Sequence, residues 1–322
     1  MRAIVFPNYG PPDVLQLIET EKPAPDENQV LVKIHASSVN PLDWHRMRAE
    51  PFLVRMGDGF LKPKDPRLGA DIAGRVEAVG KNVTEFKPGD GVFGAVGAGG
   101  FAEYVCTREK NLALKPAYVS FEAAAATPVV GFTAIQGFRH AGGIRAGQKV
   151  LVNGAAGGIG TFAVQFAKSC GAEVTGVCST RNLDMLRSIG ADHVIDYTRE
   201  DFTRTGQQYD LIYCAIGNRS VFDYRRALKP QGRCVIAGFT SLPRLFANMI
   251  LGPLASKRGD KKIDGMGVSN ANKEDLLLIR ELLETGKVVP VIDRRYPLHE
   301  TAEAIRYLET GHARGKVIIN VV

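Results

Sequence analysis

The feature that most restricts how this chain can fold is a glycine-rich turn at residues 154–160, which separates an apolar run from an amphipathic segment. The run Val150–Val152 is typical of a buried parallel strand, and the segment after the turn carries apolar residues at helical spacing. Strand, tight turn and helix form a seat for a pyrophosphate, because glycine lets the backbone approach and the helix N-terminus presents N–H groups. In the dinucleotide-binding fingerprint, Ala155 takes the first glycine position, Gly157 the second and Gly160 the third. A glycine turn without a ligand is the alternative, and a P-loop is excluded because no lysine follows Gly160.

The region around this turn, residues 149–238, alternates predicted strands with predicted helices. Five short apolar runs are predicted strands, at residues 150–152, 173–177, 193–196, 210–214 and 233–237. Helical segments are predicted at residues 161–168 and 182–189, and Gly190 ends the second. This alternation predicts right-handed βαβ crossovers and therefore an α/β fold with a doubly wound parallel sheet.

The residues before and after this region predict a second domain. Residues 1–115 are rich in β-branched residues, Gly and Pro, with the alternation of an antiparallel sheet. The tail contains predicted helices at 273–285 and 301–309 and a last strand at 316–322, and such a tail commonly completes the first domain. We therefore predict a β-rich catalytic domain of residues 1–115 and 275–322, and a dinucleotide-binding domain of residues 116–274. The site is expected in the cleft between them, outside the carboxyl ends of the parallel strands.

Composition and charge exclude several classes of protein. The longest nearly apolar stretch, residues 245–255, is interrupted by Asn248, Gly252 and Pro253 and is too short to span a bilayer. No signal peptide precedes the first predicted strand, and the five cysteines form no C-x-x-C pair, so we expect a cytoplasmic protein with reduced thiols. The net charge of +7 is dispersed along the chain rather than clustered, so we expect no nucleic-acid partner.

The end of the second predicted strand of the parallel sheet indicates which dinucleotide binds. NAD preference normally requires an Asp or Glu there, about 20 residues past the turn, to bind the ribose 2′-hydroxyl. This chain has no carboxylate at that place and offers Ser179, Thr180 and Arg181, whose hydroxyls and guanidinium suit a 2′-phosphate. We therefore predict NADPH as the cofactor. The alternative is that these residues only cap the next helix and that Arg181 faces water.

The histidines and cysteines predict a reaction without a metal ion. None of the six histidines is spaced as part of a ligand pair, so we assign no metal ligand. Without a Lewis acid, an unactivated ketone is a poor hydride acceptor. Hydride transfer to a quinone, or to the β-carbon of an enone, needs positioning and only modest hydrogen bonding. A quinone or an enone is therefore the predicted small-molecule substrate.

Six segments of the chain resemble the zinc-independent quinone oxidoreductases, the ζ-crystallin-like branch of the medium-chain dehydrogenase/reductase superfamily. The resemblance covers essentially the whole chain and rests on Ser38–Asp43, Leu68–Gly80, Lys87–Asp90, Gly154–Gly160, Gly190–Tyr197 and His312–Lys316. It implies a GroES-like catalytic domain and a Rossmann domain. Zinc-dependent relatives have a Cys ligand at the position of Asn40 and a His-Glu pair at the position of Ala70–Asp71, so these departures agree with a metal-free reaction.

The resemblance also implies roles for individual residues. Asn40 and Asp43 would line the nicotinamide end of the site and orient substrate or water. The implied cofactor-binding residues are Thr127 and Thr133 at the nicotinamide or its ribose, Ala156, Gly157, Gly158 and Ile159 at the pyrophosphate, Ser179, Arg181 and Tyr197 at the adenosine phosphate, Ile216, Gly217 and Phe239 at the nicotinamide side, and Lys316 near the last strand.

Simpler interpretations exist for three of these residues. Asn40 could be a buried turn asparagine that satisfies backbone groups, and Asp43 could cap the helix that Trp44 begins. Thr127 could be only a helix-boundary residue. No side chain is a convincing general acid, and Tyr9, His45 and water stay open as proton sources.

Three functions are consistent with these features. The first is an NADPH-dependent quinone oxidoreductase. The second is a 2-alkenal or enoyl double-bond reductase, which the same cleft could serve, and the third is a non-catalytic NADPH-binding interaction module. The resemblance further implies that the protein could form a homodimer through an edge of the Rossmann sheet.

Overall fold

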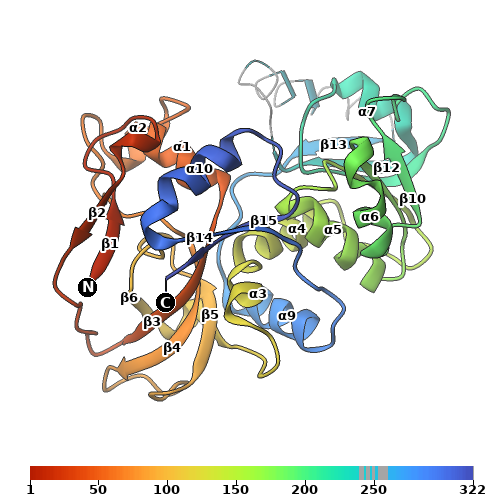
Figure 1. Cartoon of the computed structure of the whole chain (residues 1–322). Coiled ribbons are helices and arrows are strands. Elements are labelled where there is room, and N and C mark those ends of the chain that lie inside the picture. Colours follow the sequence, from red (N-terminus) through yellow and green to blue (C-terminus); the bar gives the residue numbers. More distant parts are fainter. Residues whose placement is uncertain (239–242, 244–246, 249–250, 253–259, 322) are drawn as a thin grey trace. The chain divides into compact units, whose positions relative to one another are not determined.

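The computed structural model describes residues 1–238, 243, 247–248, 251–252 and 260–321. The chain divides into two compact units, each with its own sheet (Figure 1). The first unit consists of Met1–Val129, Ala271–Gly286 and Pro290–Val322, and the second of Val130–Asn270 and Lys287–Val289. None of the helices in the described segments combines the length and the hydropathy that crossing a membrane requires.

The second unit is built on a six-stranded parallel sheet. Its strands are β8 (Lys149–Asn153), β9 (Glu173–Cys178), β10 (His193–Asp196), β11 (Tyr209–Cys214), β12 (Leu228–Ile236) and β13 (Lys262–Gly265). Their spatial order is β10-β9-β8-β11-β12-β13, and every neighbouring pair is parallel. The order reverses beside β8, as it does in doubly wound dinucleotide-binding sheets. The predicted doubly wound parallel sheet is confirmed.

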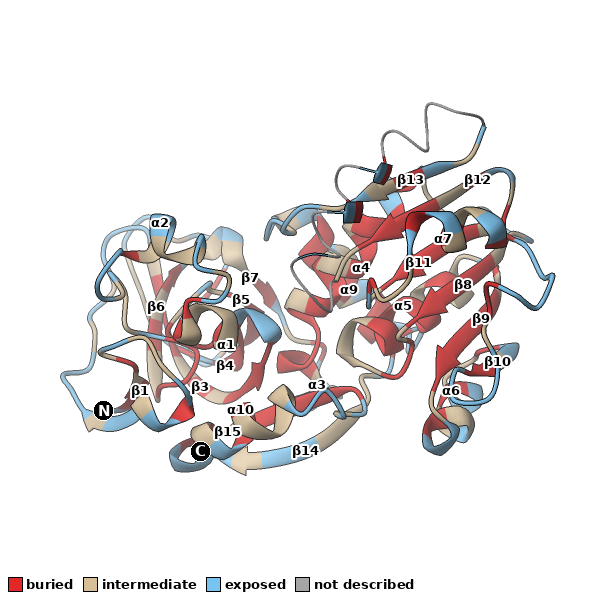
Figure 2. Cartoon of the chain, turned by 90° about the horizontal axis from the view of Figure 1, so that it is seen from above, coloured by how far each residue is buried: buried red, intermediate tan, exposed pale blue. Residues whose placement is uncertain are grey.

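The helices of this unit whose bounds the described residues give are α4 (Pro128–His140), α5 (Gly158–Ser169), α6 (Leu183–Ser188) and α7 (Val221–Ala227). The central strands β8, β9 and β11 are almost wholly buried, and Figure 2 shows most of the sheet in red. Helix α5 follows the glycine turn and contacts β8 and β9, with Phe162, Ala163 and Ala167 buried. Burial of these apolar side chains against the sheet holds the helix N-terminus beside the end of β8.

The first unit contains a mostly antiparallel seven-stranded sheet with a separate two-stranded sheet. The strands are β1 (Arg2–Val5), β2 (Gln16–Glu19), β3 (Gln29–Val39), β4 (Asp71–Val79), β5 (Gly91–Ala95), β6 (Tyr104–Arg108), β7 (Leu112–Leu114), β14 (Ile292–Pro297) and β15 (Lys316–Asn320). The large sheet runs β14-β15-β3-β4-β5-β7, and β6 also pairs with β3. The helices of this unit are α1 (Pro41–Arg48), α2 (Val54–Asp58), α3 (Phe121–Ala125), α9 (Lys273–Glu284) and α10 (Thr301–Glu309).

The C-terminal strand returns to the first unit and lies beside β3. Strands β15 and β3 are antiparallel, with Val317 opposite Val39 and Asn320 opposite Ala36. The branched side chains of Val317 and Ile319 are fully buried in the core of this unit. Pairing in this register brings the first residue of β15, Lys316, to the end of β3, where the chain enters α1 through Asn40.

Candidate functional site

The turn between β8 and α5 has the geometry of a phosphate-binding loop. Gly154 has a φ of 80°, which favours glycine, and the Ala155 N–H donates to the Val177 carbonyl of β9 at 3.0 Å. A Cβ on Gly160 would lie 2.2 Å from the Gly154 carbonyl oxygen, so the turn and the first turn of α5 touch. No side chain caps α5, whose N-cap residue is Gly157. The helix N-terminus therefore presents its N–H groups and positive dipole end where a pyrophosphate would bind.

A pair of substitutions separates the two roles of glycine in this turn. We expect Gly160→Ala to destabilise the protein by about 1–3 kcal/mol, because the new methyl group overlaps backbone atoms. Gly157→Ala is the matched control, since its φ is −81° and the nearest atom to its Cβ is at 3.8 Å. Urea denaturation without cofactor measures the difference. Equal stability of the two variants would contradict the close packing of the turn.

The predicted adenosine-phosphate residues lie at two neighbouring strand ends. Strands β9 and β10 pair with Cys178 opposite Asp196, so Ser179 and Tyr197 follow at the same edge of the sheet. The Tyr197 N–H donates to the Cys178 carbonyl at 3.0 Å, and the tyrosine ring is half exposed. Arg181 is also exposed, in the short turn that leads into α6. The structure thus brings Ser179, Arg181 and Tyr197 to one exposed edge.

Asp196 is a residue of this edge to which the sequence analysis assigned no role. Its carboxylate accepts hydrogen bonds from the hydroxyls of Thr180 and Thr198, and Arg199 lies 3.5 Å away. These donors hold the pKa of Asp196 below its ordinary value, with the Thr180 hydroxyl as the largest cause. The Thr180 hydroxyl is therefore directed to Asp196, although the sequence predicted it as a phosphate ligand. A strand-end acid one residue before Tyr197 was visible in the sequence, but its pairing with Thr180 depends on the sheet register.

The loop after β11 carries Ile216 and Gly217, both predicted at the nicotinamide side. Asn153, at the end of β8, donates from Nδ2 to the Ile216 carbonyl at 2.8 Å and to Asn218 Oδ1 at 2.9 Å. A Cβ on Gly154 would lie 2.8 Å from Cγ1 of Ile216, so this side chain packs directly on the glycine turn. The Gly217 N–H donates to the Gly238 carbonyl at 2.8 Å. Asn153 thus connects the glycine turn to the loop after β11, a role that was not identified from the sequence.

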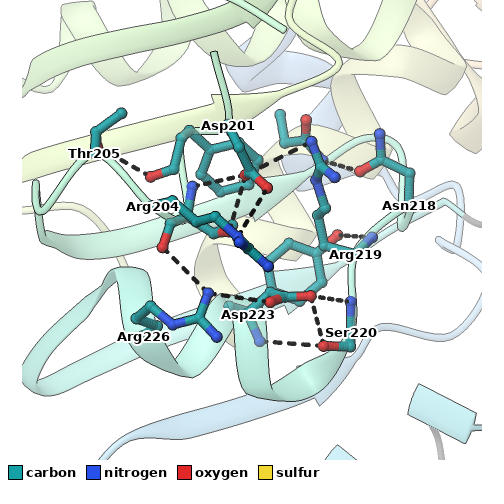
Figure 3. Close-up of polar contacts among 12 residues, drawn as sticks. Asp201, Arg204, Thr205, Asn218, Arg219, Ser220, Asp223 and Arg226 are labelled. Atoms are coloured by element: carbon teal, nitrogen blue, oxygen red, sulfur yellow. Dashed lines mark hydrogen bonds and ion pairs between the residues drawn. The ribbon is translucent and has the colours of Figure 1, made fainter.

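A polar network fixes the far side of this loop (Figure 3). The Arg219 guanidinium lies 3.6 Å from the Asp201 carboxylate. Ser220 caps α7 by accepting the Asp223 N–H, and the Asp223 carboxylate accepts the Ser220 hydroxyl at 2.6 Å. Arg226 donates to both Asp223 and the Thr203 carbonyl. These contacts anchor the loop at the start of α7, so its conformation is set by the fold rather than by a ligand.

The remaining predicted cofactor residues differ in their surroundings. Thr133, on α4, has its hydroxyl 3.1 Å from the Ser269 hydroxyl, and its carbonyl accepts the Tyr213 hydroxyl at 3.0 Å. Thr127 belongs to the first unit, is buried, and donates its hydroxyl to the Ala124 carbonyl at 2.8 Å. Phe239 lies outside the described residues.

In the first unit, Asn40 belongs to a buried polar cluster with Ser38, Asp71 and Lys316. The Lys316 ammonium donates to Asn40 Oδ1 at 2.6 Å and to the Val39 carbonyl at 3.3 Å, and it lies 3.6 Å from the Asp71 carboxylate. Asn40 Nδ2 donates to Asp71 at 2.9 Å and to the Ser38 carbonyl at 3.2 Å. Both amide hydrogens of Asn40 are therefore used inside the unit.

Asp71 is the anion at the centre of this cluster and is fully buried. Besides the ammonium, its carboxylate accepts the Ser38 hydroxyl at 2.7 Å and the Val129 N–H at 2.9 Å. Burial lowers the pKa of the Lys316 ammonium, while the nearby carboxylates of Asp71 and Asp43 act in the opposite direction. Charged groups in low-polarity surroundings need an opposite charge and hydrogen-bond partners, and the Lys316 ammonium and the Asp71 carboxylate have both.

Asp43 holds the start of α1 and is also buried. Its carboxylate accepts the Asn40 N–H at 2.8 Å and the Gly69 N–H at 2.9 Å. Helix α1 begins at Pro41, three residues before the start at Trp44 that the sequence analysis considered, because a proline fits the first helical position. Burial raises the pKa of Asp43 to about 6, although the two backbone N–H groups act to lower it. The carboxyl group therefore connects two chain segments and titrates near neutral pH.

The raised pKa of Asp43 predicts how stability depends on pH. The folded state binds this proton more tightly than the unfolded chain, whose carboxyl has the ordinary value of 3.8, so the contribution of Asp43 to stability falls as pH rises from about 4 to about 6. The full effect is about 3 kcal/mol at most. We expect the difference in unfolding free energy between the wild type and Asp43→Asn to change in this window. A difference that is constant between pH 4 and pH 7 would contradict the assignment.

The positions that correspond to metal ligands in zinc-dependent relatives carry no ligand set. Asn40 and Asp71 are both bound to the Lys316 ammonium, and Ala70 has no donor atom. Within the described ranges, no three His, Cys, Asp or Glu side chains gather as a group that could hold a metal ion. The donor chemistry of these residues therefore does not suit zinc.

Comparison with known proteins agrees with this architecture. A family model described as an alcohol dehydrogenase GroES-like domain matches residues 26–117, and one described as a zinc-binding dehydrogenase matches residues 189–319. The chain is 35% identical to a 2-methylene-furan-3-one reductase of Solanum lycopersicum, with 100% of this chain and 79% of the relative covered. It is 33% identical to an NADPH-dependent alkenal/one oxidoreductase of Arabidopsis thaliana, with 99% and 79% covered.

A solved structure is similar over the whole chain. The quinone oxidoreductase from Coxiella burnetii has a TM-score of 0.88 and 32% identity, with 100% of this chain and 99% of that chain covered. A GroES-like unit together with a doubly wound dinucleotide-binding unit defines a two-domain dehydrogenase/reductase. The chain belongs to the medium-chain dehydrogenase/reductase superfamily, among its quinone oxidoreductase-like members.

Proposed function

We propose that this protein transfers a hydride from NADPH to a quinone or a similarly activated acceptor. The observation that carries the cofactor choice is the exposed edge beside the glycine turn, where Ser179 and Arg181 follow β9. The nearest acid, Asp196, is engaged by threonine hydroxyls and Arg199, so its charge is offset rather than directed at a ribose. A guanidinium and hydroxyls suit a 2′-phosphate through charge-assisted hydrogen bonds. The names of the relatives, NADPH-dependent alkenal/one oxidoreductase and quinone oxidoreductase, support this choice.

NADPH, when bound, supplies the hydride, and the chain supplies position and electrostatics. We propose that the pyrophosphate binds at Ala156–Ile159, where the N–H groups of α5 are directed outward from the helix end. Ser179, Arg181 and Tyr197 would hold the adenosine phosphate. Thr127, Thr133, Ile216, Gly217, Phe239 and Lys316 remain the proposed residues at the nicotinamide end.

Asn40 and Asp43 are proposed to orient the acceptor or water. Because both amide hydrogens of Asn40 are used internally, we propose that it would accept a hydrogen bond through Oδ1, whose other lone pair binds Lys316. Burial raises the pKa of the Asp43 carboxyl to about 6, so this group would exchange a proton at mildly acidic pH. An acceptor of the quinone or enone type needs only such modest polar contacts.

Turnover separates the three candidate functions. Oxidation of NADPH with 1,2-naphthoquinone or 9,10-phenanthrenequinone is the expected result for the quinone reductase. A kcat/KM that is higher for a 2-alkenal than for both quinones would favour the double-bond reductase, which the 35% identity to a 2-methylene-furan-3-one reductase also favours. Tight NADPH binding without turnover of any acceptor would contradict the enzymatic function and favour a non-catalytic binding module.

Several finer assignments accompany this proposal. We propose that residues 1–115 and 275–322 form the catalytic domain and residues 116–274 the NADPH-binding domain, whereas the two compact units divide the chain after Val129 and Asn270. We further propose a cytoplasmic protein that has a small-molecule substrate and no nucleic-acid partner, and that could form a homodimer. Size-exclusion chromatography with light scattering tests the oligomeric state.

A further inference from the structure

An exposed apolar surface surrounds α2 in the first unit. Five large apolar side chains within ten residues are between 57% and 83% exposed: Phe52, Leu53, Met56, Phe60 and Leu61. Figure 2 shows the ribbon around α2 largely in pale blue. Single exposed apolar residues are common on soluble proteins, but a contiguous set marks a binding surface. We call these five residues the α2 apolar patch.

The patch is held in place by the chain beneath it. The rings of Phe52 and Phe60 are 5.6 Å apart in an edge-to-face arrangement, which joins the two ends of the patch. The Tyr9 hydroxyl donates to the Gly59 carbonyl at 2.7 Å, and Arg46 donates to Asp58 at 2.9 Å. The backbone is thus fixed to the unit while the apolar side chains point outward. A patch ordered in this way loses little conformational entropy when it binds.

The charges around the patch are predominantly positive. Lys62 directly follows Leu61 and Lys64 lies two residues later, and both lysines are exposed. The two acids next to these lysines are paired, Asp58 with Arg46 at 2.9 Å and Asp65 with Arg67 at 2.8 Å, and an exposed acid, Glu50, precedes the patch. The patch therefore presents apolar side chains beside lysines, and the acids next to these lysines are paired with arginines. Such a surface complements a partner that has negative groups at its surface and an apolar interior. An anionic lipid bilayer has these two properties together.

We propose that the α2 apolar patch inserts into the interface of an anionic lipid membrane, with Lys62 and Lys64 at the headgroups. Because more than half of the surface of each of the five residues is exposed, they suit insertion into lipid better than enclosure of a small ligand. Binding of this kind is peripheral and needs no membrane-spanning helix. It goes beyond the proposed hydride transfer and would give the enzyme access to acceptors dissolved in lipid.

Co-sedimentation with lipid vesicles tests the proposal. The full-length protein should bind vesicles of equal parts phosphatidylcholine and phosphatidylglycerol, bind pure phosphatidylcholine vesicles much less, and dissociate at high salt. The double variant Lys62→Glu/Lys64→Glu should weaken binding to the mixed vesicles by about tenfold or more. Met56→Ser/Leu61→Ser should weaken it as well, and this loss should persist at low salt. Circular dichroism confirms that the variants are folded, and all four side chains are exposed.

Two double variants outside residues 52–64 serve as matched controls. Lys87→Glu/Lys287→Glu changes the net charge equally at exposed lysines, and Phe222→Ser/Val268→Ser removes exposed apolar side chains elsewhere. Both controls should bind vesicles like the wild type, and equal losses in controls and patch variants would overturn the proposal. The proposal is also wrong if the wild type does not bind the mixed vesicles. If Met56→Ser/Leu61→Ser instead raises the KM for a water-soluble quinone, or dissociates a dimer, without affecting vesicle binding, the patch serves substrate or a second copy.

Discussion

Replacing Arg181 by alanine should weaken NADPH binding about tenfold to a hundredfold and leave NADH binding almost unchanged. Arg181 lies in the exposed turn after β9, close to Ser179 in the chain, where the 2′-phosphate that distinguishes NADPH from NADH is proposed to bind. A hydrogen bond to a charged group contributes about 1.5–3 kcal/mol, and only NADPH carries the 2′-phosphate that would receive it. Fluorescence titration of the two reduced cofactors measures both dissociation constants directly.

The control for this prediction is Arg187→Ala. Arg187 lies in α6, pairs with Asp184 at 2.8 Å and is also exposed. Its replacement by alanine changes the net charge by the same amount as Arg181→Ala. We expect NADPH affinity to stay near the wild-type value in this variant. Equal losses for NADPH and NADH in Arg181→Ala would show that Arg181 does not recognise the phosphate. The quinone reductase function could still hold, since turnover is tested independently.

Replacing Lys316 by methionine should lower the free energy of unfolding by about 3 kcal/mol. The ammonium is buried and bound to Asn40, Val39 and Asp71, so its removal leaves the Asp71 carboxylate without a cation. Removing one partner of a buried ion pair typically costs about 3–5 kcal/mol. We expect the lower end of this range, because Asp71 retains hydrogen bonds from three other groups. Urea denaturation followed by circular dichroism measures the change.

Two further variants show whether the charge or the packing is responsible. Lys316→Arg keeps the cation and should cost less than Lys316→Met. Combining Lys316→Met with Asp71→Asn removes the unpaired charge and should recover part of the lost stability, which gives a favourable coupling energy in a double-mutant cycle. If the double variant is as unstable as the sum of the two single variants, the ion pair does not contribute as proposed. A change in the KM for the acceptor in Lys316→Arg would in addition link Lys316 to the orientation of Asn40.

The local features of this protein follow closely from its sequence. Helix α10 (Thr301–Glu309) has the bounds that the sequence pattern predicts. Helix α9 begins after Asn272, whose side chain accepts the Asp275 N–H, as the capping pattern indicates. Strand β12 is longer than predicted, since it begins at Leu228 rather than at residue 233. Pro230 and Gly232 are residue types that disfavour a strand, so this part of β12 was not predicted. It pairs with β11 through a register shift near Tyr209.

The sequence also predicted the parts of the candidate site that lie close together along the chain. The glycine turn and the Ser179–Arg181 segment each appear within a single βα unit, where strand, turn and helix are consecutive. Their chemistry could be inferred because the residue types and the spacing already express it. Asp196 and Asn153 could not be inferred in the same way. Their partners, Thr180 and the Ile216 carbonyl, are set by which strands pair and in which register.

The sequence by itself therefore determined the dinucleotide-binding turn, the doubly wound sheet and the β-rich first unit, because these depend on periodicity and on residue types at short separation. Only the tertiary structure decided the surroundings of Asn40. Lys316 reaches Asn40 from 276 residues away, and Asp71 reaches it from 31 residues away, after β15 and β4 both pair with β3. Long-range strand pairing leaves no local pattern in the chain, so buried charge partners become visible only when the sheet is assembled.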